Sequence, residues 1–194
     1  MRVAPVGLVF RDDRERLWEQ ARLSALPTHR YPLGIEGAQL LALAVGLCSS
    51  MERFDRTGFF AGLLTACESA EYRAKMQEAE QVRSYDDLAG LGNRIVALHS
   101  VPTAIASFAL TPDSFEATVC NVIFLGGDTD TLAAMAGRCR VRISVSVVCR
   151  LVSSGCWRAA PKVGRTFSGL RDSCSQFTIA GRRPNQALQP TAGA

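Results

Sequence analysis

The segment IEGAQLLALAVGLCSS, residues 35–50, constrains the fold more than any other part of the sequence. Its residues are apolar or small nearly all the way round a helix. A helix of this kind is stable only when neighbouring elements cover all of its sides. We therefore expect it at the centre of a hydrophobic core. Because the chain has no run of about 18 apolar residues, we expect no membrane-spanning helix.

Helical patterns extend over most of the first 137 residues. Beside the central segment, helices are predicted for 11–26, 55–84, 100–110 and 114–127, and DTDTLAAMAG starts a further one. Residues 3–10 are expected to form a loop or buried segment, and residues 85–95 a loop between short helical pieces. Since no convincing alternating strand occurs before residue 138, the predicted fold class is all-α.

Several residues with a strong preference for helix ends mark boundaries. Asp55 or Thr57 is expected to cap the helical region that follows it, and Ser114 is expected to cap another. Pro102 stands where the first turn of a helix tolerates proline. Gly126 and Gly127 are expected to end the helix that begins after Ser114.

Charge is distributed unevenly along the 194 residues. Residues 1–137 carry 12 basic and 17 acidic residues, a net charge of −5, whereas residues 138–194 carry 10 basic residues and one acid, a net charge of +9. We interpret 1–137 as one domain and 138–194 as an irregular, poorly ordered basic tail. The seven cysteines include no CxxC pair and there are only two histidines, so neither a zinc cluster nor a disulfide scaffold is expected.

The segment LGGDTDTLAAMAG, residues 125–137, has the strongest chemical signal in the sequence. Asp128 and Asp130 lie two residues apart at a helix start, where they and the Thr131 hydroxyl can converge on one point. Hard oxygen ligands of this kind suit Mg²⁺, Ca²⁺ or Mn²⁺. The alternative is a simple N-cap, because aspartate and threonine are preferred there and acids complement the helix dipole. The two interpretations are compatible.

Four segments in order resemble the ADP-ribosylglycohydrolase family, which includes the dinitrogenase reductase-activating glycohydrolases and the eukaryotic ADP-ribosyl-acceptor hydrolases. GGDTDTLAAMAG resembles the family's C-terminal metal-binding signature. MRVAPVGLVF at 1–10 resembles a Gly-Asn-Gly-x-x-Met-Arg-x-x-Pro stretch entered at its methionine. SALPTHRYPLGIEGAQLLALAV at 24–45 resembles a Thr-His-x-x-Pro junction before a long apolar helix, and SVPTAIASF at 100–108 resembles a segment that lines the ligand cleft. The resemblance favours the metal interpretation of Asp128 and Asp130.

This resemblance implies an all-α, multi-helix orthogonal bundle that holds two Mg²⁺ (or Mn²⁺) ions in a cleft. It implies hydrolysis of the glycosidic bond between ADP-ribose and an acceptor, which is an ADP-ribosylated protein or small molecule. A structural role at a helix junction stays equally open for His29, and a core role stays open for Val101 and Phe108. The implied metal ligands are Asp128, Asp130 and Thr131, and the implied ligand-binding residues are His29, Met1, Arg2, Ser100, Val101 and Phe108.

The sequence departs from the family pattern at its N-terminal side. The family's acidic Gly-Asp-x-x-Gly segment, its Asp-Asp-Thr-type metal motif and its Gly-Asn-Gly loop do not occur. The other acid pairs, Asp12-Asp13 and Asp86-Asp87, are expected to be solvated or capping residues. We therefore expect a truncated, incomplete bundle with the apolar helix 35–47 partly exposed, weak Mg²⁺ binding and little glycohydrolase activity.

The sequence also departs from the family after Gly137, where an arginine-rich stretch replaces the family's small-residue helix. Our hypothesis is that residues 138–194 are a frameshift product, and resequencing the gene tests it.

Three functions compete at this stage. The first is an ADP-ribosylglycohydrolase, and the second is a non-catalytic fragment that binds ADP-ribose or a partner. The third, nucleic-acid binding through the basic tail, is disfavoured because the basic residues are scattered and form no recognisable motif. We expect a cytoplasmic monomer with no membrane partner.

Overall fold

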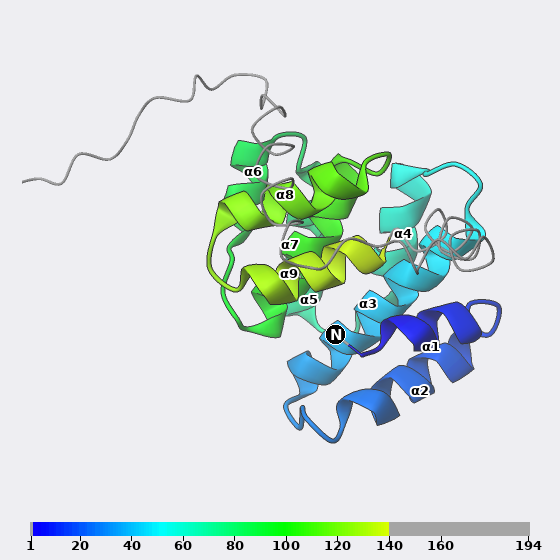
Figure 1. The fold of residues 1–194 in the computed structure, drawn as a ribbon. Coiled ribbons are helices and arrows are strands. Elements are labelled where there is room, and N and C mark those ends of the chain that lie inside the picture. Colours follow the sequence, from blue (N-terminus) through cyan, green and yellow to red (C-terminus); the bar gives the residue numbers. More distant parts are fainter. Residues whose placement is uncertain (1, 140–194) are drawn as a thin grey trace, which may run out of the picture. The chain divides into compact units, whose positions relative to one another are not determined.

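The computed structural model describes residues 2–139 of the chain, and the predictions for Met1 and for residues 140–194 lie outside this part. Within residues 2–139 all regular elements are α-helices and no strand occurs, so the predicted all-α class is confirmed. Figure 1 shows their arrangement. The helices are α1 (Ala4–Val9), α2 (Arg14–Ala25), α3 (Pro32–Ser50), α4 (Arg56–Ala66), α5 (Ala70–Gln81), α6 (Tyr85–Leu91), α7 (Ala97–Leu110), α8 (Phe115–Leu125) and α9 (Thr129–Arg138).

Helix α3 lies at the centre of the described bundle, as the sequence predicted. It packs against α1, α2, α4 and α7, and every residue from Leu40 to Gly46 is buried. The exposure expected within 35–47 is limited to the half-buried Ile35, Ala38 and Leu47. By length and composition alone α3 qualifies as a membrane span, which the sequence analysis did not anticipate, but 67% of that window is buried inside the structure. This burial is typical of a core helix.

Helix α7 is the second core helix, and all residues from Ser100 to Ala109 are buried. It packs against α3, α5, α6, α8 and α9. The predicted start at Ser100 is wrong, because the helix begins at Ala97 and Pro102 lies inside it rather than in its first turn. Proline has no N–H, so the carbonyl of Leu98 loses its usual donor one turn earlier.

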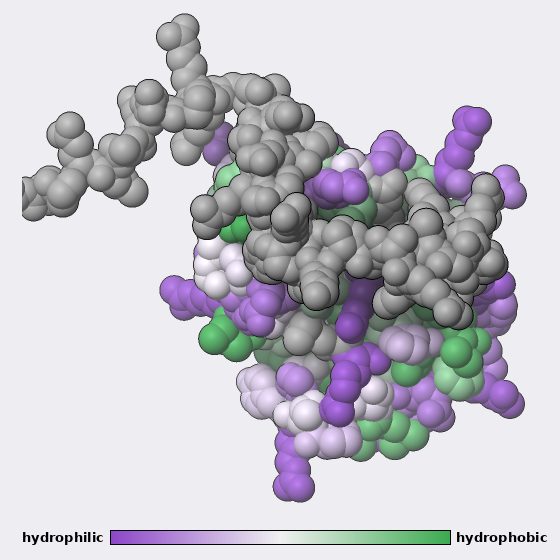
Figure 2. All heavy atoms as spheres, in the orientation of Figure 1, coloured by the Kyte–Doolittle hydropathy of each residue, from purple (hydrophilic) through white to green (hydrophobic). Residues whose placement is uncertain are grey.

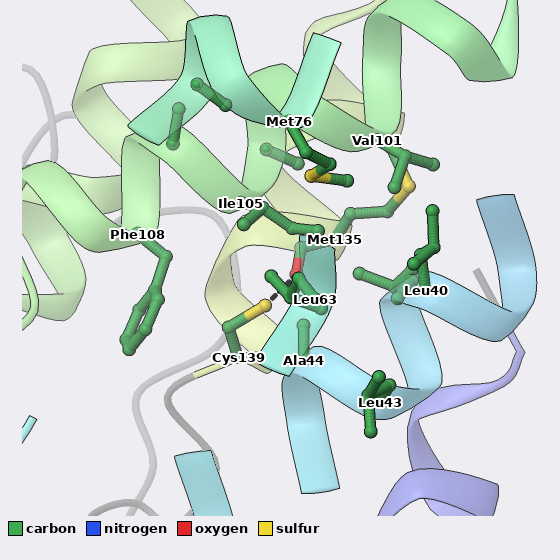
Figure 3. Close-up of a cluster of buried hydrophobic side chains, with 14 of the residues drawn as sticks. Leu40, Leu43, Ala44, Leu63, Met76, Val101, Ile105, Phe108, Met135 and Cys139 are labelled. Carbon is green, nitrogen blue, oxygen red and sulfur yellow. Dashed lines mark hydrogen bonds between the residues drawn. The ribbon is translucent and has the colours of Figure 1, made fainter. Parts of the chain in front are cut away.

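The core forms where α3, α4, α5, α7 and α9 meet (Figure 3). Leu40 and Ala44 from α3 face Val101 and Ile105 from α7, with Met135 from α9 close to them. Burial of such side chains contributes about 25 cal/mol for each Å² of apolar surface removed from water. This contact therefore fixes where α9, and the acidic turn before it, lies on the bundle.

The helical region predicted over 55–84 is two helices rather than one. Its start is capped by Asp55, as expected, with the carboxylate accepting from the N–H groups of Thr57 and Gly58. The break follows from a tertiary contact, because buried Glu36 of α3 accepts hydrogen bonds from the backbone N–H groups of Glu68 (2.9 Å) and Ser69 (3.0 Å). Ser69 then caps α5.

Three shorter segments can be compared with the sequence predictions. Residues 3–10 form the short helix α1 rather than a loop, and Gly7 lets it approach the backbone of α3 at Ala42 closely. Residues 85–95 contain α6, which begins with a capping box between Ser84 and Asp87. The predicted cap at Ser114 is confirmed, since its hydroxyl accepts from the N–H of Ala117.

Hydrophilic side chains project outward between smaller hydrophobic areas on the face shown in Figure 2. Exposed hydrophobic side chains include Ile95 and Val96 before α7, and Ile123 and Phe124 at the end of α8.

An unpaired hydroxyl in the core gives a direct test of the packing. Tyr72 is fully buried, and its Oη has no hydrogen-bond partner among the described residues. A Cβ added to Gly37 would collide with that oxygen. Burial raises the pKa of the Tyr72 hydroxyl, with smaller contributions from Glu36 and Cys67. The hydroxyl is therefore neutral and makes no hydrogen bond within residues 2–139 that would compensate for its burial.

We expect Tyr72→Phe to raise the free energy of unfolding by up to about 1 kcal/mol, because it removes an unsatisfied polar group. Gly37→Ala should lower it by about 1–3 kcal/mol through overpacking, and less in the Tyr72→Phe background. Urea denaturation of the two single variants and the double variant measures this coupling. An equal cost of Gly37→Ala in both backgrounds would contradict the described contact.

Candidate metal centre

The turn between α8 and α9 is built on two glycines. Gly126 ends α8 with φ 73° and ψ −161°, and Gly127 follows with φ 71°. Only glycine adopts such backbone angles without strain. The predicted helix end is thus confirmed, and α9 begins two residues later, at Thr129.

Asp128 occupies the N-cap position of α9, but its side chain accepts no capping hydrogen bond. The capping interpretation is therefore wrong for this side chain. Asp128 is half-buried and Asp130 is exposed. The pKa of Asp130 lies below its usual value, first because of a hydrogen bond with the Asp128 side chain, then because of the backbone N–H groups of Thr131 and Asp130. The two carboxyl groups are thus neighbours at the start of α9, two residues apart in the sequence.

The chemistry of this donor set fits a hard divalent cation. Two carboxyl groups and the half-buried Thr131 supply the oxygen donors that Mg²⁺ and Mn²⁺ prefer. The positive end of the α9 dipole opposes a cation here, so both carboxylates are needed. Within residues 2–139 no group of three or more His, Cys, Asp or Glu side chains is placed to hold a metal ion. The turn alone therefore offers too few ligands to hold two ions tightly.

Asn93, in the loop between α6 and α7, forms hydrogen bonds with the residues on either side of the glycine turn. Its side-chain Nδ2 donates to the backbone carbonyl of Leu125 (2.8 Å), and its backbone carbonyl accepts from the N–H of Asp128 (3.5 Å). A Cβ on Gly127 would lie 2.5 Å from the Asn93 carbonyl oxygen. Sequence reasoning placed Asn93 in a loop and gave it no role, because the only local signal was the Gly-Asn dipeptide of a turn.

Arg2 and His29, two of the predicted ligand-binding residues, lie together at the junction between α2 and α3. The Thr28 hydroxyl joins them, since it lies 2.9 Å from Nδ1 of His29 and accepts from Arg2 at 3.5 Å. Both side chains are exposed. His29 therefore has the hydrogen-bonded junction position that the structural interpretation predicted, and its surface position leaves a ligand role as a prediction. Within residues 2–139 the hydrogen bonds of Arg2, Thr28 and His29 do not reach the α9 turn.

The three predicted ligand-binding residues on α7 are all buried. Ser100 is 3% exposed, and Val101 packs against Gly37 of α3. Phe108 lies two turns further along α7 in an aromatic cluster, with ring centroids 5.1 Å from Phe54 and 6.0 Å from Phe59. Val101 and Phe108 thus have the core roles that the sequence left open, and contact with a ligand stays a prediction for all three.

The other acid pairs form local contacts at the starts of their own helices. Asp13 caps α2 by accepting from the N–H of Arg16, and Asp12 pairs with Arg11. Asp87 accepts from the N–H groups of Arg83 and Ser84, which lower the pKa of its carboxyl. The expectation of solvated or capping residues is confirmed for these pairs.

Cys48, Cys67 and Cys139 are buried free thiols. Burial raises the pKa of Cys67 to about 11 and of Cys139 to about 12. Burial also raises the pKa of Cys48. A thiol with such a pKa is a poor nucleophile, so these residues act in packing.

The fold and the α9 turn together define a class of protein. It is an all-α protein with a turn rich in carboxyl and hydroxyl oxygens at the start of its last described helix. The sequence model of the ADP-ribosylglycohydrolase family matches residues 1–139, and the chain belongs to this family. The resemblance predicted from the four segments is therefore confirmed.

Curated relatives agree with this assignment. The chain is 36% identical to human ADP-ribosylhydrolase ARH3 over 170 residues, covering 71% of this chain and 47% of that protein. It is 31% identical over 142 residues to an uncharacterised protein of Archaeoglobus fulgidus, covering 71% of this chain and 46% of that protein. It is 30% identical over 154 residues to the uncharacterised protein YegU of Escherichia coli, covering 70% and 46%. The chain thus spans roughly half the length of the curated relatives it matches.

The two glycines of the turn form a matched pair for testing its geometry. Both have positive φ, but a Cβ at Gly126 would meet open space whereas one at Gly127 would meet Asn93. We expect Gly126→Ala to cost about 1–3 kcal/mol of stability from backbone strain alone. Gly127→Ala should cost at least about 1 kcal/mol more because it also overpacks the turn. Urea denaturation measures both, and equal costs would contradict the described packing.

Proposed function

We propose that this chain has ADP-ribosylglycohydrolase-like function, the Mg²⁺-dependent hydrolysis of the glycosidic bond that links ADP-ribose to an acceptor. The observation that carries the proposal is the pair of carboxyl groups at the α9 start, of which Asp128 makes no capping hydrogen bond. Family membership and the name of the human relative, an ADP-ribosylhydrolase, support the reaction class. The substrate would be an ADP-ribosylated protein or small molecule.

The proposed roles follow from the chemistry of each side chain. Asp128 and Asp130 would hold a divalent cation through their carboxylates, and the Thr131 hydroxyl would add a neutral oxygen ligand. A bound Mg²⁺ or Mn²⁺ would supply Lewis-acid polarisation and a template at the ribose. Arg2 presents an exposed guanidinium that suits a phosphate, and His29 presents an exposed ring beside it. Contacts from Met1, Ser100, Val101 and Phe108 remain predictions.

We propose further that turnover is impaired. The ligand set of the α9 turn is one hydroxyl and two carboxyl groups, and a site with few charged ligands binds a divalent cation weakly. A second candidate, a fragment that binds ADP-ribose or a partner without turnover, is favoured by this same small ligand set. A monomeric protein in the cytoplasm stays part of the proposal.

Cation binding tests the site itself. Asp128→Asn and Asp130→Asn should each weaken Mn²⁺ binding at least about tenfold, because each removes a charged oxygen ligand and preserves shape. Asp86→Asn is the matched control, since Asp86 is an exposed acid in the first turn of α6. Isothermal titration calorimetry with Mn²⁺ and Mg²⁺ measures the affinities. The same loss in all three variants would contradict the assignment.

Activity tests the reaction. We expect slow release of ADP-ribose from ADP-ribosylated arginine or serine peptides, stopped by EDTA and by Asp128→Asn, because the cation is held weakly. Chromatography of released ADP-ribose measures it. Fast Mg²⁺-dependent turnover would contradict the impairment, and turnover that survives EDTA would contradict the metal dependence. ADP-ribose binding without any turnover would favour the second candidate.

A further inference from the structure

The loop between α6 and α7 supports the acidic turn from behind. Asn93 is a half-buried residue of this loop. It contacts the residues on both sides of the glycine turn. Its side-chain Nδ2 donates to the carbonyl of Leu125, the last residue of α8. Its backbone carbonyl accepts from the N–H of Asp128, the residue before α9. The residue thus bridges the two helices across the glycines.

The position of Asn93 is itself fixed by the core. The buried Thr103 hydroxyl on α7 donates a 2.7 Å hydrogen bond to the carbonyl of Gly92. The Nδ1 of His99 lies 3.3 Å from the carbonyl of Leu91. Gly92 has φ +95°, a conformation that favours glycine and turns the chain toward the α8–α9 turn. A rigid core helix therefore holds the loop that holds the turn.

The hydrogen-bond pattern requires an amide side chain at position 93. Asparagine has a side-chain N–H₂ donor, and the carbonyl of Leu125 can only accept. Aspartate has the same shape without the donor, and alanine has neither. Groups that orient metal ligands without touching the metal typically change its affinity 10- to 100-fold when they are removed.

We propose that Asn93 is a positioning residue for the proposed cation-binding turn, because it fixes the backbone on both sides of the two glycines that precede Asp128 and Asp130. This inference rests on the proposed function for its consequence, the cation affinity. Its structural half, the order of residues 126–131, stands independently.

The test compares Asn93→Ala and Asn93→Asp with Asn121→Ala, all in the full chain. Asn121 is the matched control, because it is also half-buried and its Nδ2 also donates one hydrogen bond, to Thr111 Oγ1 at 3.3 Å. Asn93→Asp preserves the shape of the side chain and serves if Asn93→Ala does not fold. Backbone ¹⁵N relaxation reports the order of residues 126–131 without metal, and electron paramagnetic resonance reports Mn²⁺ affinity.

Both Asn93 variants should lower the order parameters at 126–131 and weaken Mn²⁺ binding about tenfold, whereas Asn121→Ala should do neither. Unchanged order at 126–131 in the Asn93 variants would overturn the inference, and so would an equal loss of affinity in Asn121→Ala. A wild-type chain that binds no Mn²⁺ would overturn the proposed function. Loosening of the turn in the Asn93 variants would still support the positioning role in that case.

Discussion

The packing of α3 against α7 is the contact on which the rest of the described bundle depends. Both helices are apolar on nearly every side, so neither is stable until other helices cover it. Helices α1, α2 and α4 cover α3, while α5, α6, α8 and α9 cover α7. Gly37 lets α3 approach both Val101 of α7 and the Tyr72 side chain of α5 closely. The order of the other helices around these two follows from this requirement.

Contacts with the same core fix the position of the acidic turn. Met135 anchors α9 against α7, and Thr103 of α7 anchors the loop that contains Asn93. The turn before α9 and the loop before α7 therefore meet, and the contact leaves no room for a side chain at Gly127. The core thus fixes the turn that carries Asp128 and Asp130 at the start of α9.

The sequence predicted much of this because several of its signals are local. Periodicity and end-forming residues indicated most helices, and the caps at Asp55 and Ser114 and the end at Gly126 depend only on neighbouring residues. The break between α4 and α5 escaped prediction because Glu36, some thirty residues away, binds its backbone N–H groups. The predicted start of α7 at Ser100 was wrong, and the short helix α1 lies where a loop or buried segment was expected.

For the candidate site, the sequence indicated the residues of the turn but not the residue that contacts it from the neighbouring loop. The motif and its resemblance indicated Asp128, Asp130 and Thr131, and the turn has the expected glycine geometry. The role of Asn93 depends on a contact across more than thirty residues, which no local pattern encodes. The burial of Val101 and Phe108 could not be separated from a ligand role, because a cleft wall and a core have the same apolar composition.

The central claim is that a divalent cation binds at the start of α9. Paramagnetic broadening of backbone amide signals by substoichiometric Mn²⁺ tests it most directly, because the effect reports where the ion sits. The account predicts broadening centred on Gly127 to Thr131, reaching Asn93 across the turn. Broadening centred instead on the acid pairs Asp12-Asp13 or Asp86-Asp87, or spread evenly over acidic residues, would contradict it.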